Sequence, residues 1–373
     1  MKVNLSRIGG TRNPEPGTWN SELGTFFWLK LQFNLFSTIF FNRTKLNTHT
    51  KFNYCYFCRY SNLHHSLKAA GPIEYVSRKY ESAETPLFSI LIPTWNNLEM
   101  LQLCISSIIK NSFYKHQIIL HINEGTDGTL AWVEEQQFDH TFSKSNIGVC
   151  YAINAAAGLV KTDFIVYLND DMYVCPDWDK YLWEEVQLMP DKLFYLSATA
   201  IEPFDAGKKC AITPYSFGTS PAAFREMELL ANFRSLPMHN WNGASWPPAL
   251  VHRDIWNTVG GYSVEFFPGF YSDPDFSLKL WQIGVRNFKG VSRSRVYHFL
   301  EHSTKRMGNR RVKDGNILFL NKWGITANMF YKFYLQMGSP YKGPLPEVEE
   351  TFAYKKKKFT SRIKKLFTDG AAL

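Results

Sequence analysis

The sequence predicts an α/β domain built on a doubly wound, mostly parallel sheet with flanking helices. Short apolar runs at residues 87–93, 117–122 and 163–168 have the length and composition of buried strands. Segments in which apolar residues recur at helical spacing separate these runs. This alternation of strand and helix is typical of crossover connections between parallel strands.

The first predicted strand, at residues 87–93, is a continuous apolar run, as expected where both faces of a sheet are covered. A helix is predicted over residues 98–109, because Leu101, Ile105 and Ile108 recur at intervals of three and four positions. These intervals place the three side chains on one face of the helix, which can then pack on the sheet.

The following elements continue the alternation. Strands are predicted at residues 117–122 and 163–168, and helices at residues 129–137 and 149–160. Far along the chain, another helix is predicted over residues 276–283, with Asp275 as a supporting residue that caps it. A length of 373 residues accommodates one large α/β domain with appendages.

Polar residues gather where the predicted strands end. The three clusters occupy residues 93–97, 123–128 and 169–171. Each could be only a turn or a helix cap, since Asn, Asp and Gly are common in both. In doubly wound sheets, however, ligands bind beyond the carboxyl ends of the strands. The placement of all three polar clusters at strand ends therefore predicts a ligand site at this edge of the sheet.

The carboxylates of Asp170 and Asp171 suit a ligand that contains a nucleoside diphosphate. Mg²⁺ or Mn²⁺ neutralises the charge of a departing diphosphate, and both ions prefer oxygen ligands. Adjacent residues of a strand face opposite ways, so one carboxylate should bind the metal. The other carboxylate should face the nucleotide-containing ligand or the neighbouring loop.

The charge of the chain is unevenly distributed. There are 42 Lys and Arg against 33 Asp and Glu, and the basic excess lies at the two ends. The body, residues 86–340, has no net positive charge. Because nucleic-acid binding needs a dense basic face, this distribution argues against a nucleic-acid partner.

Motifs in the body resemble those of the family 2 glycosyltransferases, which have the GT-A fold. They occur in the family's order at residues 88–97, 123–129, 146–154, 167–171, 260–262, 273–281 and 296–298. The resemblance implies a single catalytic domain at residues 86–325. Outside it lie a poorly defined extension, residues 1–85, and a helical, basic tail, residues 326–373.

The resemblance implies an inverting transfer of a sugar from a nucleotide-sugar to an acceptor hydroxyl of a glycan or lipid-linked glycan. UDP is the nucleotide that the family favours, and Mg²⁺ or Mn²⁺ is the implied cofactor. Asp273 occupies the position of the base that takes the proton of the acceptor hydroxyl. Aromatic residues at 241–246 and 266–271 border the acceptor or belong to the core.

The resemblance also assigns residues to the donor and the metal. The nucleotide-sugar would be bound by Pro93, Thr94, Asn96, Glu124, Asp127, Asn146, Gly148, Asn169 and Asp170. Asp171 is the implied metal ligand, and His298 the second candidate. The sequence departs from the pattern at Asn169, where the first Asp of the metal motif is expected, and at Ser272, where an acidic residue is usual.

These two departures support an alternative function. A protein of the same fold could bind a nucleotide-sugar or a glycan without turnover. Asp171, Asp273 and His298 are all present and argue against this alternative. A nucleotidyltransferase is disfavoured, because the first predicted strand is not followed by a glycine-rich loop with a basic residue.

Both ends of the chain contain segments with apolar residues. Residues 26–41 are short for a spanning helix, which needs about 20 residues. They are expected to be a membrane-inserted or interfacial helix, a local appendage, or an upstream extension outside the functional domain. In the basic segment at residues 355–365, Phe359 and Ile363 share a helical face with Leu366 and Phe367. Such a helix suits an anionic membrane surface or a solvated tail. The expected location is cytoplasmic, at the inner face of a membrane.

Overall fold

The computed structural model describes residues 74–80, 85–205, 207–300 and 309–368. The chain divides into two units, Met1–Ser61 and Asn62–Leu373, and every described residue belongs to the second. The apolar segment at residues 26–41 lies outside the described residues.

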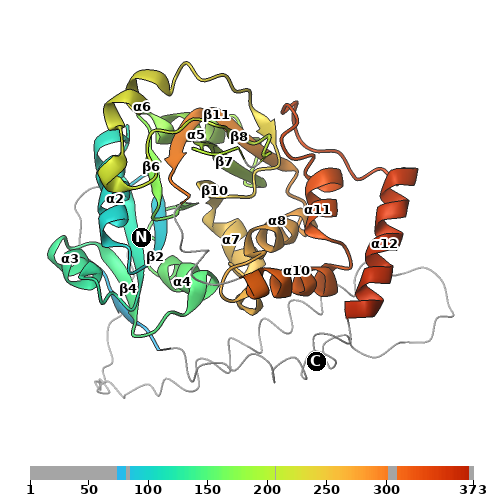
Figure 1. The fold of residues 1–373 in the computed structure, drawn as a ribbon, viewed down its shortest axis with the longest axis horizontal. Helices are drawn as coiled ribbons and strands as arrows, with labels where there is room; N and C mark the ends of the chain where they lie inside the picture. The colour runs from blue at the N-terminus through green and yellow to red at the C-terminus, as the bar shows by residue number, and fades with distance from the viewer. Residues whose placement is uncertain (1–73, 81–84, 206, 301–308, 369–373) are drawn as a thin grey trace, which may run out of the picture. The chain divides into compact units, whose positions relative to one another are not determined.

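A single sheet of 11 strands organises the second unit (Figure 1). The strands are β1 (Val76–Arg78), β2 (Ser89–Trp95), β3 (Gln117–Asn123), β4 (Asp139–Ser143), β5 (Phe164–Tyr167), β6 (Met172–Val174), β7 (Phe194–Ile201), β8 (Ala211–Ile212), β9 (Trp241–Asn242), β10 (Ala249–His252) and β11 (Asn287–His298). Their order is β1-β4-β3-β2-β5-β10-β7-β11-β6, with β8 beside β7 and β9 beside β11.

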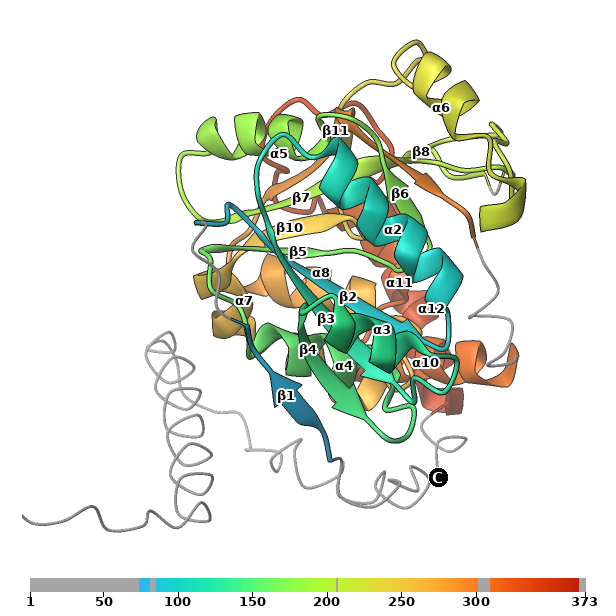
Figure 2. The ribbon, with the colours of Figure 1, turned by 90° about the vertical axis from the view of Figure 1, so that its left-hand side faces the viewer.

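Helices cover both faces of this sheet (Figures 1 and 2). The longer ones are α2 (Leu98–Asn111), α3 (Thr129–Glu135), α4 (Gly148–Ala157), α5 (Trp178–Gln187), α6 (Glu226–Asn232), α7 (Arg253–Val259), α8 (Ser272–Gln282), α10 (Asn309–Trp323) and α12 (Phe352–Thr368). Short turns are η2 (Pro221–Ala223), η3 (Val264–Phe266), α11 (Ala327–Met329) and η4 (Phe330–Tyr334).

The predicted fold class is confirmed. The longest ladders are parallel, with β7 and β11 paired over eight residues and β2 and β3 over seven. Antiparallel ladders join β10 to its neighbours β5 and β7, and place β1 and β6 at the two ends of the strand order. Each strand and helix predicted between residues 87 and 168 is present, whereas β4 was not predicted because its sequence, Asp-His-Thr-Phe-Ser, is mostly polar.

Alternate side chains of β2 enter two different cores. Leu91 packs in a cluster with α4, α7, α8 and α10, whereas Ile90 and Ile92 pack in a cluster with α2 and α5. All three side chains are fully buried. The unbroken apolar run that predicted this strand therefore reflects a sheet covered on both faces.

Pro93 marks the place where β2 and β5 separate. The two strands are paired only over Ser89–Leu91. The N–H of Leu168, the residue after β5, donates to Leu91 O. Pro93 lies two residues further and faces the same side, but proline has no N–H to donate. The pairing with β3 continues to Trp95. The sheet therefore opens at its carboxyl edge between β2 and the residues after β5.

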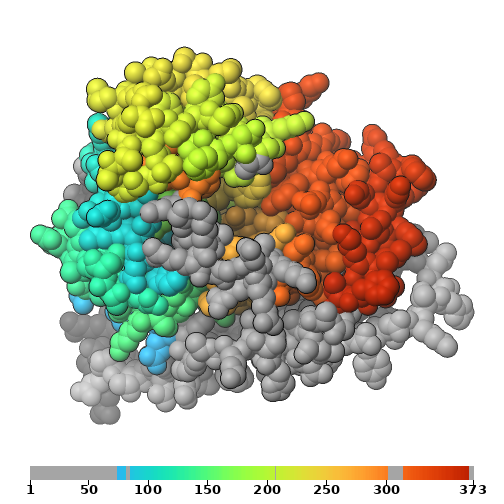
Figure 3. Space-filling view, in the orientation of Figure 1, coloured from blue at the N-terminus to red at the C-terminus, as the bar shows by residue number. Residues whose placement is uncertain are grey.

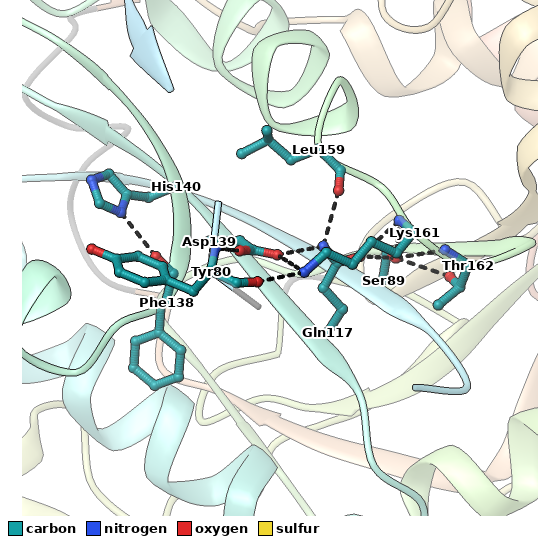
Figure 4. Close-up of polar contacts among 9 residues, drawn as sticks. All are labelled: Tyr80, Ser89, Gln117, Phe138, Asp139, His140, Leu159, Lys161 and Thr162. Atoms are coloured by element: carbon teal, nitrogen blue, oxygen red, sulfur yellow. Dashed lines mark hydrogen bonds and ion pairs between the residues drawn. The ribbon is translucent and has the colours of Figure 1, made fainter. Parts of the chain in front are cut away.

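A buried polar network fastens the opposite, amino end of these strands (Figure 4). Gln117 Nε2 donates to Asp139 Oδ2 at 2.6 Å and to Leu159 O at 2.9 Å. Gln117 Oε1 accepts from Ser89 Oγ at 2.6 Å and from Lys161 N at 2.9 Å. One amide therefore ties β2, β3 and β4 to the segment that follows α4.

Gln117→Leu is expected to lower the free energy of unfolding by about 3 kcal/mol, since each buried polar group left unpaired costs about 1–3 kcal/mol. Urea unfolding followed by tryptophan fluorescence measures this change. Gln136→Leu, on the exposed residue after α3, is the matched control and should change stability by no more than about 0.5 kcal/mol. Equal stability of the two variants would show that the network contributes nothing.

The last part of the chain adds to the core rather than ending at α10. Phe330, Leu335, Leu345 and Tyr354 are buried in the cluster that contains Phe276. The basic segment forms α12, which packs beside α10. Among the described residues, none of the helices combines the length and apolarity that crossing a bilayer requires.

Candidate active site

The carboxyl ends of β2 and β3 form the first part of the candidate site. Asn96 and Glu124, just beyond these ends, have positive φ angles of 45° and 64°. Residues with side chains rarely adopt this conformation, and such strain clusters at functional sites. Glu124 Oε2 accepts hydrogen bonds from Trp95 Nε1 at 2.9 Å and from Asn96 Nδ2 at 3.2 Å. The two strand ends are thus held together by side chains.

Asp127 and Asn146, both predicted to bind the donor, each lie two residues before a helix. Asp127 Oδ2 accepts from Leu98 N, the first residue of α2, and its Oδ1 accepts from Thr129 N, the first residue of α3. These bonds hold the pKa of Asp127 below its ordinary value, although partial burial raises it. Asn146 Oδ1 accepts from Gly148 N at 2.8 Å at the start of α4. Both side chains therefore fix the loops that surround the site.

Gly148 allows the start of α4 to approach the segment that precedes α8. Its φ is 73°, and a Cβ atom there would lie 2.7 Å from Phe267 and 2.9 Å from Pro268. Val149 N–H donates to Pro268 O at 2.7 Å. The absence of a side chain at Gly148 therefore brings the donor-side loops close to the segment that carries Asp273.

Asp170 and Asp171 lie in the turn after β5 and face different partners. Asp170 Oδ2 accepts from Thr94 Oγ1 at 2.7 Å and from Asn97 Nδ2 at 3.3 Å. Asp171 Oδ1 lies 3.4 Å from His298 Nε2. Asn169, the half-buried first residue of this motif, accepts a hydrogen bond from Cys104 Sγ through its carbonyl. Asp170 thus contacts the end of β2, whereas Asp171 faces the end of β11.

His298 lies between two carboxylates. Its Nδ1 is 3.2 Å from Glu202 Oε1, and Lys208 Nζ lies 2.9 Å from the same oxygen. Burial alone would lower the pKa of His298, but the carboxylates of Asp171 and Glu202 outweigh it and raise that pKa to about 9. Burial raises the pKa of Glu202, yet His298 and Lys208 together bring it below its ordinary value.

Asp171 and His298 would fit a divalent metal ion once the imidazole has released the proton that the two carboxylates hold on it. An oxygen and a nitrogen bound to one ion at about 2.0–2.2 Å lie about 3 Å apart, close to the 3.4 Å found here. No group of three or more such ligands occurs among the described residues. Phosphate oxygens of a donor and water would complete the coordination, as is usual for Mg²⁺. Glu202 would orient the imidazole, which is how outer carboxylates act at many metal sites.

Asp273 lies in the first turn of α8, two residues after Tyr271, which has a φ of 66°. Asp273 Oδ1 accepts a hydrogen bond from Tyr262 Oη at 3.0 Å. Loss of solvent raises the pKa of Asp273 from its ordinary range to about 7, although the bond from Tyr262 lowers it. A carboxyl group with a pKa near neutrality suits proton transfer.

Tyrosines connect Asp273 to the strand ends. The rings of Tyr167, at the end of β5, and Tyr262 meet edge to face with centroids 5.8 Å apart. Burial, and then the carboxylates of Asp273, Asp171 and Asp170, raise the pKa of Tyr167. The candidate base and the candidate metal motif therefore lie around the same buried ring.

The aromatic residues predicted near the acceptor divide into two groups. Trp241 and Phe266 belong to the core, and Trp241 Nε1 donates to Thr199 Oγ1 at 2.9 Å. Trp246 is half-buried and packs edge to face on Tyr331, with centroids 5.7 Å apart. Burial, and then the charge of Asp273, raise the pKa of Tyr331. Trp246 and Tyr331 therefore lie on the Asp273 side of the site.

The predicted capping role of Asp275 is wrong. The helix begins at Ser272, four residues earlier than the sequence pattern indicated, so Asp275 lies inside the first turn. Its fully buried carboxylate accepts from Trp323 Nε1 at 2.8 Å and lies 2.7 Å from Lys322 Nζ, both in α10. Asp275 therefore joins α8 to α10.

Comparison with known proteins identifies the domain. Residues 89–226, which run from β2 to the first residue of α6, match the model of glycosyl transferase family 2. The chain carries a family 2 glycosyltransferase domain. The resemblance that the motifs indicated is thereby confirmed.

Named relatives of this glycosyltransferase domain occur in bacteria. The chain is 24% identical to a hyaluronan synthase of Pasteurella multocida over 278 residues, 70% of this chain and 26% of that protein. It is 30% identical to a chondroitin synthase of Pasteurella multocida (strain Pm70) over 96 residues, 25% of this chain and 10% of that protein. The chain thus spans about a quarter or less of the length of these relatives.

Solved structures show distant likeness to the glycosyltransferase domain. TarS 1–349 of S. aureus in complex with UDP-GlcNAc has a TM-score of 0.46 and 12% identity, covering 76% of this chain and 73% of that one. The mannosyltransferase PcManGT from Pyrobaculum calidifontis, in complex with GDP-Man and Mn²⁺, has a TM-score of 0.46 and 14% identity, covering 85% and 81%.

Three further residues of the candidate site were not predicted from the sequence. Glu202 follows β7, a strand that was not predicted from the sequence. Tyr262 belongs to a recognised Gly-Gly-Tyr motif, but no role was assigned to its hydroxyl. Tyr331 lies in an irregular turn far from the motifs. A rule that examines the residue after every apolar strand would have found Glu202.

Proposed function

We propose that the domain transfers a sugar from a nucleotide-sugar to an acceptor hydroxyl with inversion at the anomeric carbon. The observation that carries this proposal is the position of Asp273, whose pKa is about 7. It is hydrogen-bonded to Tyr262, whose ring packs on Tyr167 at the end of β5, shortly before Asp170 and Asp171. The catalytic unit would centre on residues 86–325, between the extension at 1–85 and the tail at 326–373, and the first part of the tail would add Tyr331 to the site and further residues to the core.

The donor would lie along the ends of β2 and β3. Pro93, Thr94, Asn96 and Glu124 would line the nucleoside pocket, and the loops fixed by Asp127, Asn146 and Gly148 would border it. Asn169 and Asp170 would contact the ribose or the diphosphate. A UDP-sugar is the proposed donor, on the basis of the family resemblance.

Asp171 and His298 would hold Mg²⁺ or Mn²⁺. When bound, this ion supplies positive charge that stabilises the diphosphate as a leaving group. Lys208, which is paired with Glu202, adds a further cation on this side of the site. Tyr167 and the other buried aromatic rings would exclude water from the reacting atoms.

Asp273 would act on the acceptor. Its carboxylate takes the proton from the acceptor hydroxyl while that oxygen bonds to the anomeric carbon. The bond between the anomeric carbon and the phosphate oxygen breaks, and the nucleoside diphosphate leaves. Attack from the face opposite the leaving group inverts the anomeric carbon. Tyr262 keeps the carboxylate oriented through its hydrogen bond.

The acceptor would be a glycan or a lipid-linked glycan. Two relatives are named as synthases of the glycans hyaluronan and chondroitin. The ring of Trp246, half-buried beside Tyr331, offers an apolar face of the kind that sugar rings contact. A lipid-linked acceptor would place the enzyme at the cytoplasmic face of a membrane.

A donor panel tests the proposal. The full chain is incubated with UDP- and GDP-sugars in the presence of Mn²⁺, Mg²⁺ or EDTA, and released nucleoside diphosphate is measured. Metal-dependent release from one donor is expected. Saturable binding without release, even with glycan acceptors added, would support the alternative of a binding protein without turnover. Absence of binding to every nucleotide-sugar would refute the proposed function.

Turnover is expected to increase with pH through about 7, because Asp273 accepts a proton only when ionised and its pKa is about 7. The rate constant kcat/KM for the donor, measured from about pH 5 to about pH 9, gives the midpoint. Tyr262→Phe removes a bond that lowers the pKa of Asp273, so the midpoint should move to higher pH. An unchanged midpoint would indicate that another group is the base.

A further inference from the structure

The two long sides of α12 differ in what they contact. Tyr354 and Ser361 are buried against the body of the protein, and Lys365 Nζ donates to Asn321 O at 2.9 Å. These residues lie on one face of the helix, since residues seven apart are separated by almost two full turns. Figure 1 shows α12, in red, at the edge of the fold beside α10 and α11.

The opposite face of α12 is apolar and exposed. Its stripe consists of Phe352, Phe359, Ile363, Leu366 and Phe367, which are 84%, 63%, 39%, 75% and 80% exposed. At 100° per residue, these five positions lie within about 100° of one another and centre about half a turn away from Tyr354 and Ser361. The stripe therefore does not serve to pack α12 on its own domain.

Basic residues surround the apolar stripe. Between its first and last residues, α12 contains Lys355, Lys356, Lys357, Lys358, Arg362, Lys364 and Lys365, and it contains no Asp or Glu. Lys358 pairs with Glu350, which precedes the helix, and most of the other basic side chains are exposed. In Figure 3, the red atoms of the C-terminal part lie at the outer edge of the described surface.

We propose that this face of α12 docks on an anionic lipid surface, with the apolar stripe inserted at the level of the acyl-chain boundary and the lysines against the headgroups. Charge complementarity selects this partner, because the basic residues of α12, with no acidic residue among them, match anionic headgroups, and the exposed apolar stripe matches the acyl chains beneath. A second copy of the same helix would bring like charges together. The proposal does not depend on catalysis, since α12 lies outside the candidate site.

Vesicle sedimentation of the full chain tests the proposal. The protein should co-sediment with vesicles of phosphatidylcholine and phosphatidylglycerol, and only weakly with phosphatidylcholine alone. Binding should weaken as salt is raised, because ions screen the lysines. Lys355→Gln, Lys356→Gln and Lys357→Gln combined should weaken binding by about 100-fold.

A pair of matched variants separates the stripe from general surface hydrophobicity. Leu366→Gln with Phe367→Gln should weaken vesicle binding by at least about tenfold. Leu188→Gln with Met227→Gln, at positions 74% and 76% exposed on the body, should leave it unchanged. Circular dichroism melting curves should coincide for all these proteins, since each replaced side chain is exposed.

Three results would overturn the proposal. They are absence of binding to anionic vesicles at low salt, equal binding of the two matched double variants, and a dimer in sedimentation velocity that the Leu366 and Phe367 substitutions dissociate. None of them bears on nucleotide-sugar turnover. Vesicle binding without turnover would contradict only the proposed function, and turnover without vesicle binding would contradict only the docking of α12.

Discussion

Asp273→Asn is expected to lower sugar transfer by about 10²–10⁴-fold while leaving nucleotide binding nearly unchanged. The amide has almost the shape of the carboxyl group and can still accept the hydrogen bond from Tyr262, but it cannot take a proton at neutral pH. Initial rates of transfer, together with calorimetric titration of the nucleoside diphosphate, measure the two quantities on the same protein.

Asp254→Asn is the matched control for this substitution. Asp254 lies in the first turn of α7, as Asp273 lies in the first turn of α8, but its side chain is exposed and paired with Lys192. This control should retain full transfer. Equal loss of transfer and nucleotide binding in Asp273→Asn would contradict the assignment of Asp273 as the base and indicate a structural role.

Asp171→Ala is expected to weaken the metal-dependent binding of the nucleoside diphosphate by at least about 100-fold. A direct metal ligand contributes more to metal affinity than an outer residue that orients a ligand. Loss of such an outer residue already lowers metal affinity by about 10–100-fold. Glu202→Gln, which leaves Asp171 and His298 in place, should therefore have the smaller effect. Mn²⁺ titration followed by electron paramagnetic resonance measures metal affinity without any turnover.

Asp163→Ala is the matched control, because it also removes an acidic residue that lies next to β5. Asp163 precedes β5, at the end opposite to Asp171, and pairs with Arg253 on the surface. Its Mn²⁺ titration should match that of the unmodified protein. If the titration of Asp171→Ala is also unchanged, the metal is held elsewhere, and Asp170 becomes the candidate to test next.

The half of the fold that follows simple patterns could be predicted from the sequence. Strands β2, β3 and β5 are short apolar runs, and α2 and α4 have apolar residues at helical spacing, so local pattern and tertiary environment agree. β4 was missed, since its polar side chains are satisfied by partners from other segments. Asp139 is one example, held by Gln117 and paired with Lys161.

The site could be predicted only as a set of positions. Polar clusters at successive strand ends placed Asp170 and Asp171 near the ends of β2 and β3, because parallel strands end at a common edge. That Asp170 faces Thr94 while Asp171 faces His298 depends on β6 and β11, which lie at the far end of the strand order. Local sequence carries no information about such distant pairings.

The sequence by itself determined the α/β class, the edge of the sheet where polar residues gather, the family resemblance, and the amphipathic pattern of the last helix. These properties depend on the order and spacing of residues along the chain. Only the tertiary structure decided that Glu202 holds His298, that tyrosines surround Asp273, and that the apolar face of α12 points away from the body. The physical reason is that burial and pairing energies arise between segments far apart in sequence, which meet only when the sheet is assembled.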